Sequence, residues 1–402
     1  MSRPHQAVIL AGGRGERLRP LTDAVPKPMI GFHGKPFLEY LVEQLRQQGF
    51  DRILLLLGYL PDKVRDHFGD GRRFGVRIEY SVTAVENETG ARIRLAKDLL
   101  DPCFLLMYCD NYWPLRIDAM WDQYLRTGAL AQLTVYSNKD GYTKHNLKVD
   151  DQGMVICYDK TKKAPGLQGT DIGYILADRR ALDLMPEGNV NFEKEVFPIL
   201  VRQRKLSGFV TDHRYYSVGS HESLPLTERF LARKPCVILD RDGVLNEKAS
   251  KADYVKRWDQ FRWFSGAMEA VGLLKREGYT VIVVTNQAGI ARGMMTESDL
   301  ADIHNRMNQD LASSNASIDA IYHCPHGWDS GCECRKPRPG MLFSAQRDFH
   351  LDLSRTVFVG DDPVDKEAGD AACCPTLLVD DQWPLLRIVR EKILGADRPR
   401  FA

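Results

Sequence analysis

The chain has 402 residues, of which 44% are hydrophobic and 27% are charged, and its formal net charge is +1. A chain of this length usually forms more than one hydrophobic core, so we expect two domains. The scattered Lys and Arg side chains form no basic run, which argues against nucleic acid or an anionic membrane as a partner. No signal sequence and no apolar run long enough to span a bilayer is visible, so we expect a cytoplasmic protein.

In the first half of the chain, short apolar runs alternate with segments whose hydrophobic residues recur at helical spacing. Runs of this length are typical of buried strands. We expect strands at residues 7–10, 53–57, 77–81 and 104–108, and helices at residues 36–47, 91–99 and 222–231. This alternation predicts an α/β domain with a parallel sheet.

A second α/β domain begins after Lys234 and Pro235, which interrupt the pattern. We therefore expect residues 1–232 to form the first domain and residues 233–402 the second. In the second domain we expect strands at residues 236–239, 280–284, 318–322 and 356–359, and helices at residues 266–276, 297–311 and 385–393.

A glycine-rich loop follows the first predicted strand. Gly12, Gly13 and Gly15 permit the close backbone approach that lets a loop wrap a phosphate chain in N–H donors. Arg17 and Lys27 would add positive charge beside that loop. These residues predict a phosphate-binding site, although a glycine-rich loop on its own also occurs as an ordinary turn.

The sequence around this loop closely resembles the signature of the sugar-1-phosphate nucleotidyltransferase family. The resemblance rests on residues 12–22, 26–29 and 34–36, and it extends in weaker form to about residue 231. It implies a Rossmann-like, GT-A-like mixed sheet whose loop holds a nucleoside triphosphate. Arg17 and Lys27 would then stabilise the α-phosphate while a sugar phosphate oxygen attacks it and pyrophosphate leaves.

Other positions of the first domain match the same family. The resemblance implies that Asp110 binds Mg²⁺, that Lys160 holds the sugar phosphate and that Glu193 contacts the sugar. Two positions depart from the family pattern. Glu16 stands where the family usually has Thr, and Ser217 stands where it normally has a second metal-binding aspartate.

Two carboxylates, Asp240 and Asp242, follow the first strand of the second domain. At a strand end, one carboxylate can attack phosphorus while the other transfers protons, which is a chemistry of phosphate-ester cleavage. Further polar residues follow later in the chain: Thr285, Asn286, Lys336, Asp361, Asp362 and Asp365. In this order the residues resemble the haloacid dehalogenase superfamily of phosphatases over residues 235–394.

That resemblance implies a Rossmann-like parallel sheet and a role for each acidic residue. Asp240 would be the nucleophile that forms an aspartyl-phosphate, and Asp242 would be the general acid and base. Asp240, Asp361 and the carbonyl oxygen of Asp242 would hold Mg²⁺. Asp362 and Asp365 could support this site or carry the charge at the start of a helix.

Three thiols and an imidazole lie close together just ahead of residue 336: Cys324, His326, Cys332 and Cys334. They form the ligand set of a closed, four-coordinate zinc site. Their spacing is not that of zinc fingers or ribbons, so spacing alone leaves a cluster of reduced thiols as the alternative. A disulfide is not expected in the cytoplasm.

The cysteine segment and residues 285–293 resemble one branch of the superfamily, the D-glycero-D-manno-heptose 1,7-bisphosphate phosphatases and the related histidinol-phosphate phosphatases. In that branch the zinc loop shapes substrate access, and Arg335 would meet the remote phosphate. The superfamily resemblance further implies that Thr285 and Asn286 bind the phosphoryl oxygens and that Lys336 balances their charge. Asp362 stands where the branch often has a basic residue.

The two resemblances together imply a bifunctional enzyme. The phosphatase would leave a sugar 1-phosphate, which the first domain would join to a nucleotide, with GTP favoured, toward an activated heptose. Mg²⁺ would serve both sites and Zn²⁺ the second domain. The alternatives are another sugar phosphate with CTP or another NTP, suggested by residues 88–92; histidinol phosphate; a first domain that only binds a nucleotide sugar; and a nucleic-acid 3′-phosphatase. The oligomeric state is not predicted.

Overall fold

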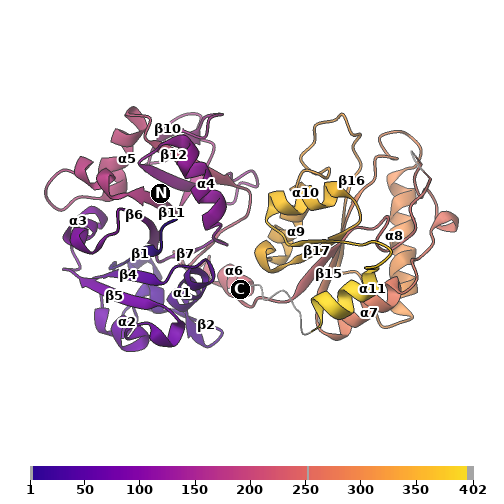
Figure 1. Cartoon of the computed structure of the whole chain (residues 1–402), viewed down its shortest axis with the longest axis horizontal. Coiled ribbons are helices and arrows are strands. Elements are labelled where there is room, and N and C mark those ends of the chain that lie inside the picture. Colours follow the sequence, from indigo (N-terminus) through magenta and orange to yellow (C-terminus); the bar gives the residue numbers. More distant parts are fainter. Residues whose placement is uncertain (1–2, 251–252, 396–402) are drawn as a thin grey trace. The chain divides into compact units, whose positions relative to one another are not determined.

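The computed structural model of the chain describes residues 3–250 and 253–395. Contacts within the chain divide it into two units, Met1–Leu231 and Ala232–Ala402 (Figure 1). Each unit consists of a sheet with helices, so the predicted α/β fold class is confirmed. Among the helices in the described ranges, none is both long and apolar enough to cross a membrane.

The first unit contains a seven-stranded mixed sheet. Its strands are β1 (Gln6–Ala11), β4 (Arg52–Leu57), β5 (Arg77–Val82), β6 (Cys103–Tyr108), β8 (Ala131–Tyr136), β11 (Thr170–Asp178) and β12 (Leu206–Thr211), in the order β12-β8-β11-β6-β1-β4-β5. Strand β11 runs antiparallel to β6 and β8, and the other neighbours are parallel. The parallel sheet expected from the alternation was therefore wrong at β11, and the mixed sheet implied by the family resemblance is confirmed.

The described part of this unit also contains the α-helices α1 (Phe37–Gln47), α2 (Pro61–Phe68), α3 (Thr89–Leu95), α4 (Ile117–Thr127), α5 (Phe192–Arg202) and α6 (Leu224–Leu231). The helix predicted at residues 91–99 begins earlier and ends at Leu95, where a separate 3-10 turn (Lys97–Leu99) follows. Two short strands, β7 (Asn111–Tyr112) and β13 (Tyr216–Ser217), pair beside the sheet.

Strand β4 explains why the central strands read as continuous apolar runs. Ile53, Leu55 and Leu57 pack into one hydrophobic core. Leu54 and Leu56 point to the opposite face and pack into another. Because helices cover both faces of the sheet, both sets of side chains are buried and no polar alternation is needed.

The second unit contains a five-stranded parallel sheet. Its strands are β14 (Cys236–Leu239), β15 (Thr280–Asn286), β16 (Ala320–Cys324), β17 (Val357–Gly360) and β18 (Thr376–Leu378), in the order β16-β15-β14-β17-β18. Its helices are α7 (Ala267–Arg276), α8 (Glu297–Ala312), α9 (Gly340–Phe349), α10 (Pro363–Ala372) and α11 (Leu385–Arg387), the last continued by a π-helical segment (Ile388–Ile393). The strand predicted at residues 318–322 lies two residues later in the structure.

Parallel register brings the carboxyl ends of neighbouring strands to one edge of each sheet. In the first unit, Leu10 of β1 lies opposite Leu56 of β4 and Tyr108 of β6. In the second unit, Leu239 of β14 lies opposite Val283 of β15 and Val359 of β17. The loops that carry the predicted site residues therefore leave the same edge of their sheet.

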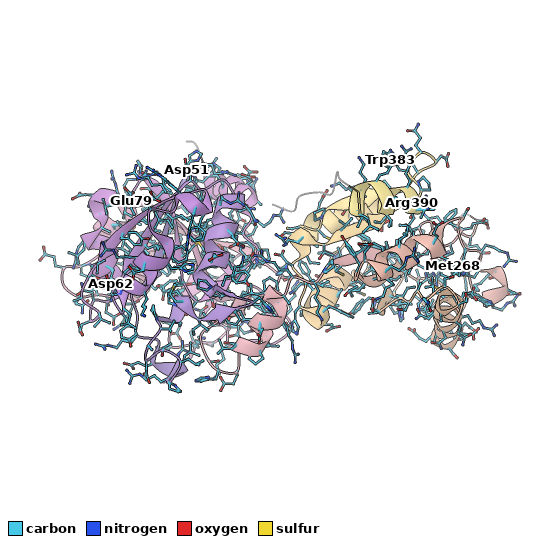
Figure 2. The ribbon with its side chains drawn as sticks, turned by 90° about the horizontal axis from the view of Figure 1, so that it is seen from below. Asp51, Asp62, Glu79, Met268, Trp383 and Arg390 are labelled. Carbon is cyan, nitrogen blue, oxygen red and sulfur yellow. The ribbon has the colours of Figure 1, made fainter. Side chains whose placement is uncertain are left out.

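Charged side chains outside these edges lie mainly at the surface. Asp51 and Asp62 of the first unit and Arg390 of the second are exposed examples (Figure 2). Such residues are not candidates for buried catalytic chemistry.

Leu55→Ala is expected to reduce the free energy of unfolding of the first unit by about 2–5 kcal/mol, because it leaves a cavity in a core where Leu55 is fully buried. Urea unfolding measures this change. The control is Leu95→Ala, since the Leu95 side chain is 65% exposed and its loss should change stability by less than about 0.5 kcal/mol. Equal losses for the two variants would contradict the assignment of Leu55 to the core.

Candidate functional site

The glycine-rich loop after β1 borders a cavity of about 410 Å³ in the first unit. Gly15 has a φ of 66°, and a Cβ atom there would lie 3.1 Å from the Cβ atom of Lys27. The cavity is lined by Arg14, Gly15, Glu16, Arg17, Lys27, Val85 and Gly219. Three of these residues are cationic, so the cavity suits a polyanionic ligand.

Lys27 forms an ion pair with Asp110, with 2.7 Å between Nζ and Oδ2. Burial lowers the pKa of Lys27, but the Asp110 carboxylate outweighs this effect and the net pKa is raised. Ser217 pairs with Asn111 across β13 and β7, and the adjacent Val218 N–H donates to the Asp110 carbonyl at 2.8 Å. Ser217 therefore lies beside Asp110. Within the described residues, no group of three potential metal ligands includes Asp110.

A second polar cluster surrounds Lys160. Its Nζ atom donates to Glu193 Oε2 at 2.5 Å and to Asn191 Oδ1 at 3.0 Å. Glu193 is buried in the first turn of α5. The structure thus brings together Lys160, the residue expected to hold the sugar phosphate, and Glu193, the residue expected to contact the sugar.

Asp171 belongs to the same cluster, although sequence reasoning did not select it. An irregular register in β11 turns its carboxylate toward the Gly173 N–H, which donates to Oδ1 at 2.9 Å, and Tyr158 donates to Oδ2 at 3.4 Å. Burial, followed by repulsion from Glu193, raises the pKa of Asp171 to about 7. Asp171 can therefore carry a proton near neutral pH. The Asp-x-Gly sequence within an apolar run was its one available signal.

Arg92 belongs to the segment 88–92 that suggested CTP, but the sequence assigned it no role of its own. It is buried, and its guanidinium donates to the carbonyl oxygens of Leu57 and Val85, both at 2.9 Å, and of Gly12 at 3.3 Å. A Cβ atom on Gly12 would lie 2.4 Å from this guanidinium. Arg92 thus ties the glycine-rich loop to the ends of neighbouring strands, and a side chain at position 12 would displace it.

In the second unit, the ammonium group of Lys336 lies between two carboxylates. Its Nζ atom is 2.8 Å from Asp240 Oδ2 and 2.7 Å from Asp365 Oδ1. All three residues are buried. Burial raises the pKa of Asp240 against the opposing effect of Lys336. Burial lowers the pKa of Lys336, but Asp240 and Asp365 outweigh it and the net pKa is raised.

Asp240, Asp361 and Asp365 form a cluster whose carboxylate oxygens lie within 4.8 Å of one another. Asp361 Oδ1 is buried and has no hydrogen-bond partner in the described part of the chain. Gly243 permits this approach, because its φ is 95° and a Cβ atom there would lie 2.1 Å from Asp361 Oδ2. Hard oxygen ligands with a free buried oxygen fit a Mg²⁺ ion. Lys248 Nζ lies 2.5 Å from Asp361 Oδ2.

Asp242 is not part of this cluster and is held by three side chains. The buried Arg241 donates to both of its carboxylate oxygens, at 3.0 and 2.8 Å. Asn246 donates at 2.9 Å and Gln287 at 2.7 Å. Burial raises the pKa of Asp242, but Arg241 and the hydrogen bonds prevail and lower it. In this arrangement Asp242 is a carboxylate, the form that accepts a proton. Sequence reasoning assigned no role to Arg241, Asn246 or Gln287.

The remaining predicted phosphate ligands lie at the end of β15. Thr285 is buried and its hydroxyl accepts a hydrogen bond from Gln287 at 2.9 Å. Asn286 donates to the Lys336 carbonyl and accepts from the Lys336 N–H, both at 3.1 Å. Asn286 therefore fixes the backbone of the residue that contacts Asp240.

Asp362 and Asp365 together cap helix α10. The Asp362 side chain accepts from the Val364 N–H, and the Asp365 side chain accepts from the Asp362 N–H, both at 3.1 Å. Asp365 also contacts Lys336, so it belongs to the carboxylate cluster as well as to the cap. From the sequence alone, Asp365 could not be assigned to the catalytic site, because a capping role could equally explain an aspartate at this position.

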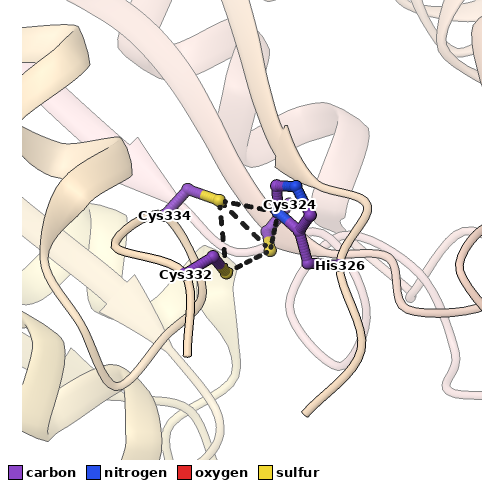
Figure 3. Close-up of side chains that lie close together, drawn as sticks. All are labelled: Cys324, His326, Cys332 and Cys334. Carbon is purple, nitrogen blue, oxygen red and sulfur yellow. Dashed lines mark hydrogen bonds between the residues drawn. The ribbon is translucent and has the colours of Figure 1, made fainter. Parts of the chain in front are cut away.

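The thiols of Cys324, Cys332 and Cys334 converge with the imidazole of His326 (Figure 3). His326 Nδ1 lies 3.2 Å from Cys334 Sγ and 3.6 Å from Cys324 Sγ, and the three sulfur atoms lie 3.4–3.6 Å apart. These separations fit four ligands around one tetrahedral metal ion. Arg335, next to the cluster, donates from Nη1 to the His326 carbonyl at 3.5 Å.

Comparisons with known proteins match the two halves to different families. The nucleotidyl transferase family model matches residues 6–145, and the polynucleotide kinase 3 phosphatase family model matches residues 235–374. The chain is 43% identical over 143 residues to the D-glycero-beta-D-manno-heptose-1,7-bisphosphate 7-phosphatase of Pseudomonas aeruginosa, covering 36% of this chain and 79% of that protein. The Escherichia coli K12 protein of the same name is 39% identical over 145 residues, covering 34% and 74%.

A solved structure resembles the chain in fold alone. It is a Bacillus anthracis protein assigned as a glucose-1-phosphate thymidylyltransferase and solved in complex with a sucrose. It aligns with a TM-score of 0.50 at 21% identity, covering 56% of this chain and 93% of its own.

Asp171→Asn is expected to gain stability over the wild type as pH rises. The unfolded carboxyl ionises near 3.8 and the folded one near about 7, so the wild type loses stability across that interval and the uncharged Asn does not. Urea unfolding at about pH 5 and about pH 8 measures the difference. Asp178→Asn is the control, because the net pKa of Asp178 is lowered and its charge therefore does not change between these two pH values, so its stability difference should be independent of pH. A pH-independent difference for Asp171→Asn would contradict the assignment.

Cys332→Ser is expected to lower the bound zinc and the Tm of the second unit, because a three-ligand site holds the ion less firmly. Elemental analysis by mass spectrometry and thermal unfolding with and without a chelator test this. Cys157→Ser, a half-buried thiol outside the cluster, should leave the zinc content unchanged. Purified wild type without zinc, and with a Tm insensitive to chelator, would instead indicate a cluster of reduced thiols.

Proposed function

This chain belongs to the family of the D-glycero-beta-D-manno-heptose-1,7-bisphosphate 7-phosphatases, and we propose that its two units catalyse consecutive steps toward a nucleotide-activated heptose. The second unit would remove the 7-phosphate of the bisphosphate. The first unit would transfer a nucleotidyl group to the resulting sugar 1-phosphate and release pyrophosphate. The observation that carries this proposal is the convergence of Asp240, Asp361, Asp365 and Lys336 at one sheet edge.

Asp240 is the proposed nucleophile of the second unit. Its Oδ2 atom is held by Lys336, which would also attract the phosphoryl group and offset its charge. Attack on phosphorus would form an aspartyl-phosphate and release the sugar oxygen. Thr285 and Asn286 would orient the phosphoryl oxygens from the end of β15.

Asp242 is the proposed proton carrier. It would protonate the departing sugar oxygen and then take a proton from the water that hydrolyses the aspartyl-phosphate. The hydrogen bonds from Arg241, Asn246 and Gln287 favour the carboxylate, which suits the second of these steps. Protonation for the first step would require the substrate to weaken at least one of these contacts.

Asp240, Asp361 and the carbonyl oxygen of Asp242 would hold Mg²⁺, with Asp365 beside them. The ion would supply charge neutralisation at the phosphoryl group. Cys324, His326, Cys332 and Cys334 would hold a structural Zn²⁺ that fixes the loop next to Arg335, the proposed contact of the remote phosphate.

The first unit would bind the NTP in the cavity beside the glycine-rich loop, where Gly12, Gly13 and Gly15 let the backbone approach the phosphates. Arg17 and Lys27 would stabilise the charge on the α-phosphorus during in-line attack. Asp110 would bind Mg²⁺, Lys160 would hold the sugar phosphate, and Glu193 would contact the sugar. We propose GTP as the nucleotide, with CTP as the alternative.

Two observations favour alternatives that the same assay separates. Ser217 leaves Asp110 without a second carboxylate at that position, which would suit a first unit that binds a nucleotide sugar without reacting. The match of residues 235–374 to the polynucleotide kinase 3 phosphatase family favours a nucleic-acid 3′-phosphatase as another candidate. The near-neutral net charge opposes the latter, because polyanion binding needs basic surface.

Asp240→Asn is expected to abolish phosphate release from heptose 1,7-bisphosphate while retaining pyrophosphate release from heptose 1-phosphate with NTP. Lys27→Ala is expected to lower pyrophosphate release by at least about 100-fold and to retain phosphate release, because a cation that meets transition-state charge contributes a few kcal/mol. Coupled phosphate and pyrophosphate assays with each anomer and each of the four NTPs measure both activities.

Each variant serves as the control for the other, since each alters one unit. Loss of both activities in a folded variant would contradict the two-site model. If none of the four NTPs gives pyrophosphate, the first unit would be one that only binds a nucleotide sugar. Phosphate release from a 3′-phosphorylated oligonucleotide, but from no sugar bisphosphate, would identify a nucleic-acid phosphatase.

A further inference from the structure

An exposed tryptophan stands on the loop between two of the proposed zinc ligands. Trp328 is 79% exposed, the largest value among the exposed large hydrophobic side chains of the described residues. It lies between His326 and Cys332 in the chain. An indole ring left in water forgoes the stabilisation that burial would bring, and it is available to a ligand.

The loop that carries Trp328 is anchored on both sides. His326 and Cys332 belong to the Cys/His cluster (Figure 3). The Ala291 N–H donates to the Pro325 carbonyl at 3.1 Å, which ties the loop to the turn after β15. An aromatic ring on such a frame can contact a ligand with little loss of conformational entropy.

A cation lies next to the indole ring. Arg292 Cζ is 5.9 Å from the centroid of the Trp328 ring and 6.0 Å from that of Tyr254. Arg292 Nη1 also donates to the Tyr254 hydroxyl at 3.4 Å. Tyr254 in turn packs on Gly289, where a Cβ atom would lie 3.0 Å from its ring. The two aromatic rings therefore hold the guanidinium from separate segments.

The two segments that contact the Trp328 loop lie next to proposed catalytic residues in the chain. The turn that contains Gly289 and Arg292 begins at Gln287, which donates to Asp242. Arg335, which donates to the loop at His326, directly precedes Lys336, the partner of Asp240. Arg292 and Arg335 thus lie on segments that also carry Gln287 and Lys336, which contact the two aspartates of the proposed phosphatase site.

We propose that Trp328 is the platform on which the sugar part of a phosphorylated substrate packs. The C–H bonds of a sugar form an apolar face that suits an indole ring, and the cation of Arg292 beside it suits a substrate with a second anionic group. The platform would bind the part of the substrate that does not react. This inference rests on the proposed phosphatase function of the second unit.

Trp328→Ala and Trp328→Phe test the platform against two substrates. One is heptose 1,7-bisphosphate, and the other is acetyl phosphate, which has a transferable phosphoryl group but no sugar. For Trp328→Ala, we expect the ratio of kcat/KM for the bisphosphate to that for acetyl phosphate to fall about tenfold, equivalent to about 1.4 kcal/mol. The loss should lie mainly in KM, and Trp328→Phe should recover most of it because the phenyl ring keeps an aromatic face.

The matched control is Leu378→Ala, at a residue that is 37% exposed on β18, the edge of the sheet opposite β16. This variant should leave the ratio unchanged. An equal fall for both substrates in Trp328→Ala would show that the residue supports the fold of the site and would overturn the platform. An unchanged ratio would overturn it too, while leaving the phosphatase assignment intact. If the wild type hydrolyses acetyl phosphate but no sugar bisphosphate, both proposals fail together.

Binding without turnover gives a second measurement. In an Asp240→Asn background, the bisphosphate should quench tryptophan fluorescence, and adding Trp328→Phe should remove most of that quenching. Inorganic phosphate is the control ligand and should quench little, since it has no sugar to cover the ring. Equal quenching with and without Trp328 would contradict direct contact.

Discussion

The second unit depends on one buried ion triad, in which Lys336 separates Asp240 from Asp365. Two carboxylates this close repel each other strongly in a region that excludes water, and the ammonium between them offsets that repulsion. Removing one partner from a buried pair typically costs about 3–5 kcal/mol, because the other charge is left uncompensated. The residue that stabilises the folded site is therefore also the residue that orients the proposed nucleophile. Asn286 strengthens this link by fixing the Lys336 backbone.

The first unit uses the same type of pairing with fewer charges. Lys27 is paired with Asp110 at the carboxyl edge of its sheet. Ser217 lies beside them where a second carboxylate would bring another negative charge. Cationic side chains dominate the neighbouring cavity, which suits binding a triphosphate by direct charge contact. The site in the first unit thus has an excess of positive charge, and the site in the second unit has an excess of negative charge. The second site therefore has the greater need for a divalent cation.

The sequence was most informative where chemistry and secondary structure coincide. The positions after β14, β15 and β17 could be predicted as a site because a buried apolar run followed by acidic or polar residues is a local pattern. Strands β8 and β12 were not predicted because other residues interrupt their apolar runs. Gln132 and Thr134 are polar but buried in β8, and Gly208 of β12 packs against Val149. These strands become recognisable only through their tertiary contacts.

The supporting residues were harder to predict than the ligands they support. Arg92 and Gln287 act through hydrogen bonds to groups far away in the sequence, and Arg241 holds the neighbouring Asp242, but no local spacing marks any of these roles. Asp171 lies at an irregular register of β11, and Glu193, which acts on it electrostatically, belongs to the separate helix α5. Asp365 is four residues from Asp361, and its position in the sequence indicates only a capping residue. Its ion pair with Lys336 is evident only in the structure. Long-range contacts decide such roles, and a single sequence does not contain them.

The most direct test of this account is to trap the covalent intermediate of the second unit. The chain would be mixed with heptose 1,7-bisphosphate and Mg²⁺, quenched with acid during turnover, digested and analysed by mass spectrometry. We expect a phosphoryl group on the peptide that contains Asp240, and its absence when Asp240 is replaced by Asn. Phosphate release with no phosphorylated peptide, or with the phosphoryl group on another residue, would contradict the assignment of Asp240 as the nucleophile.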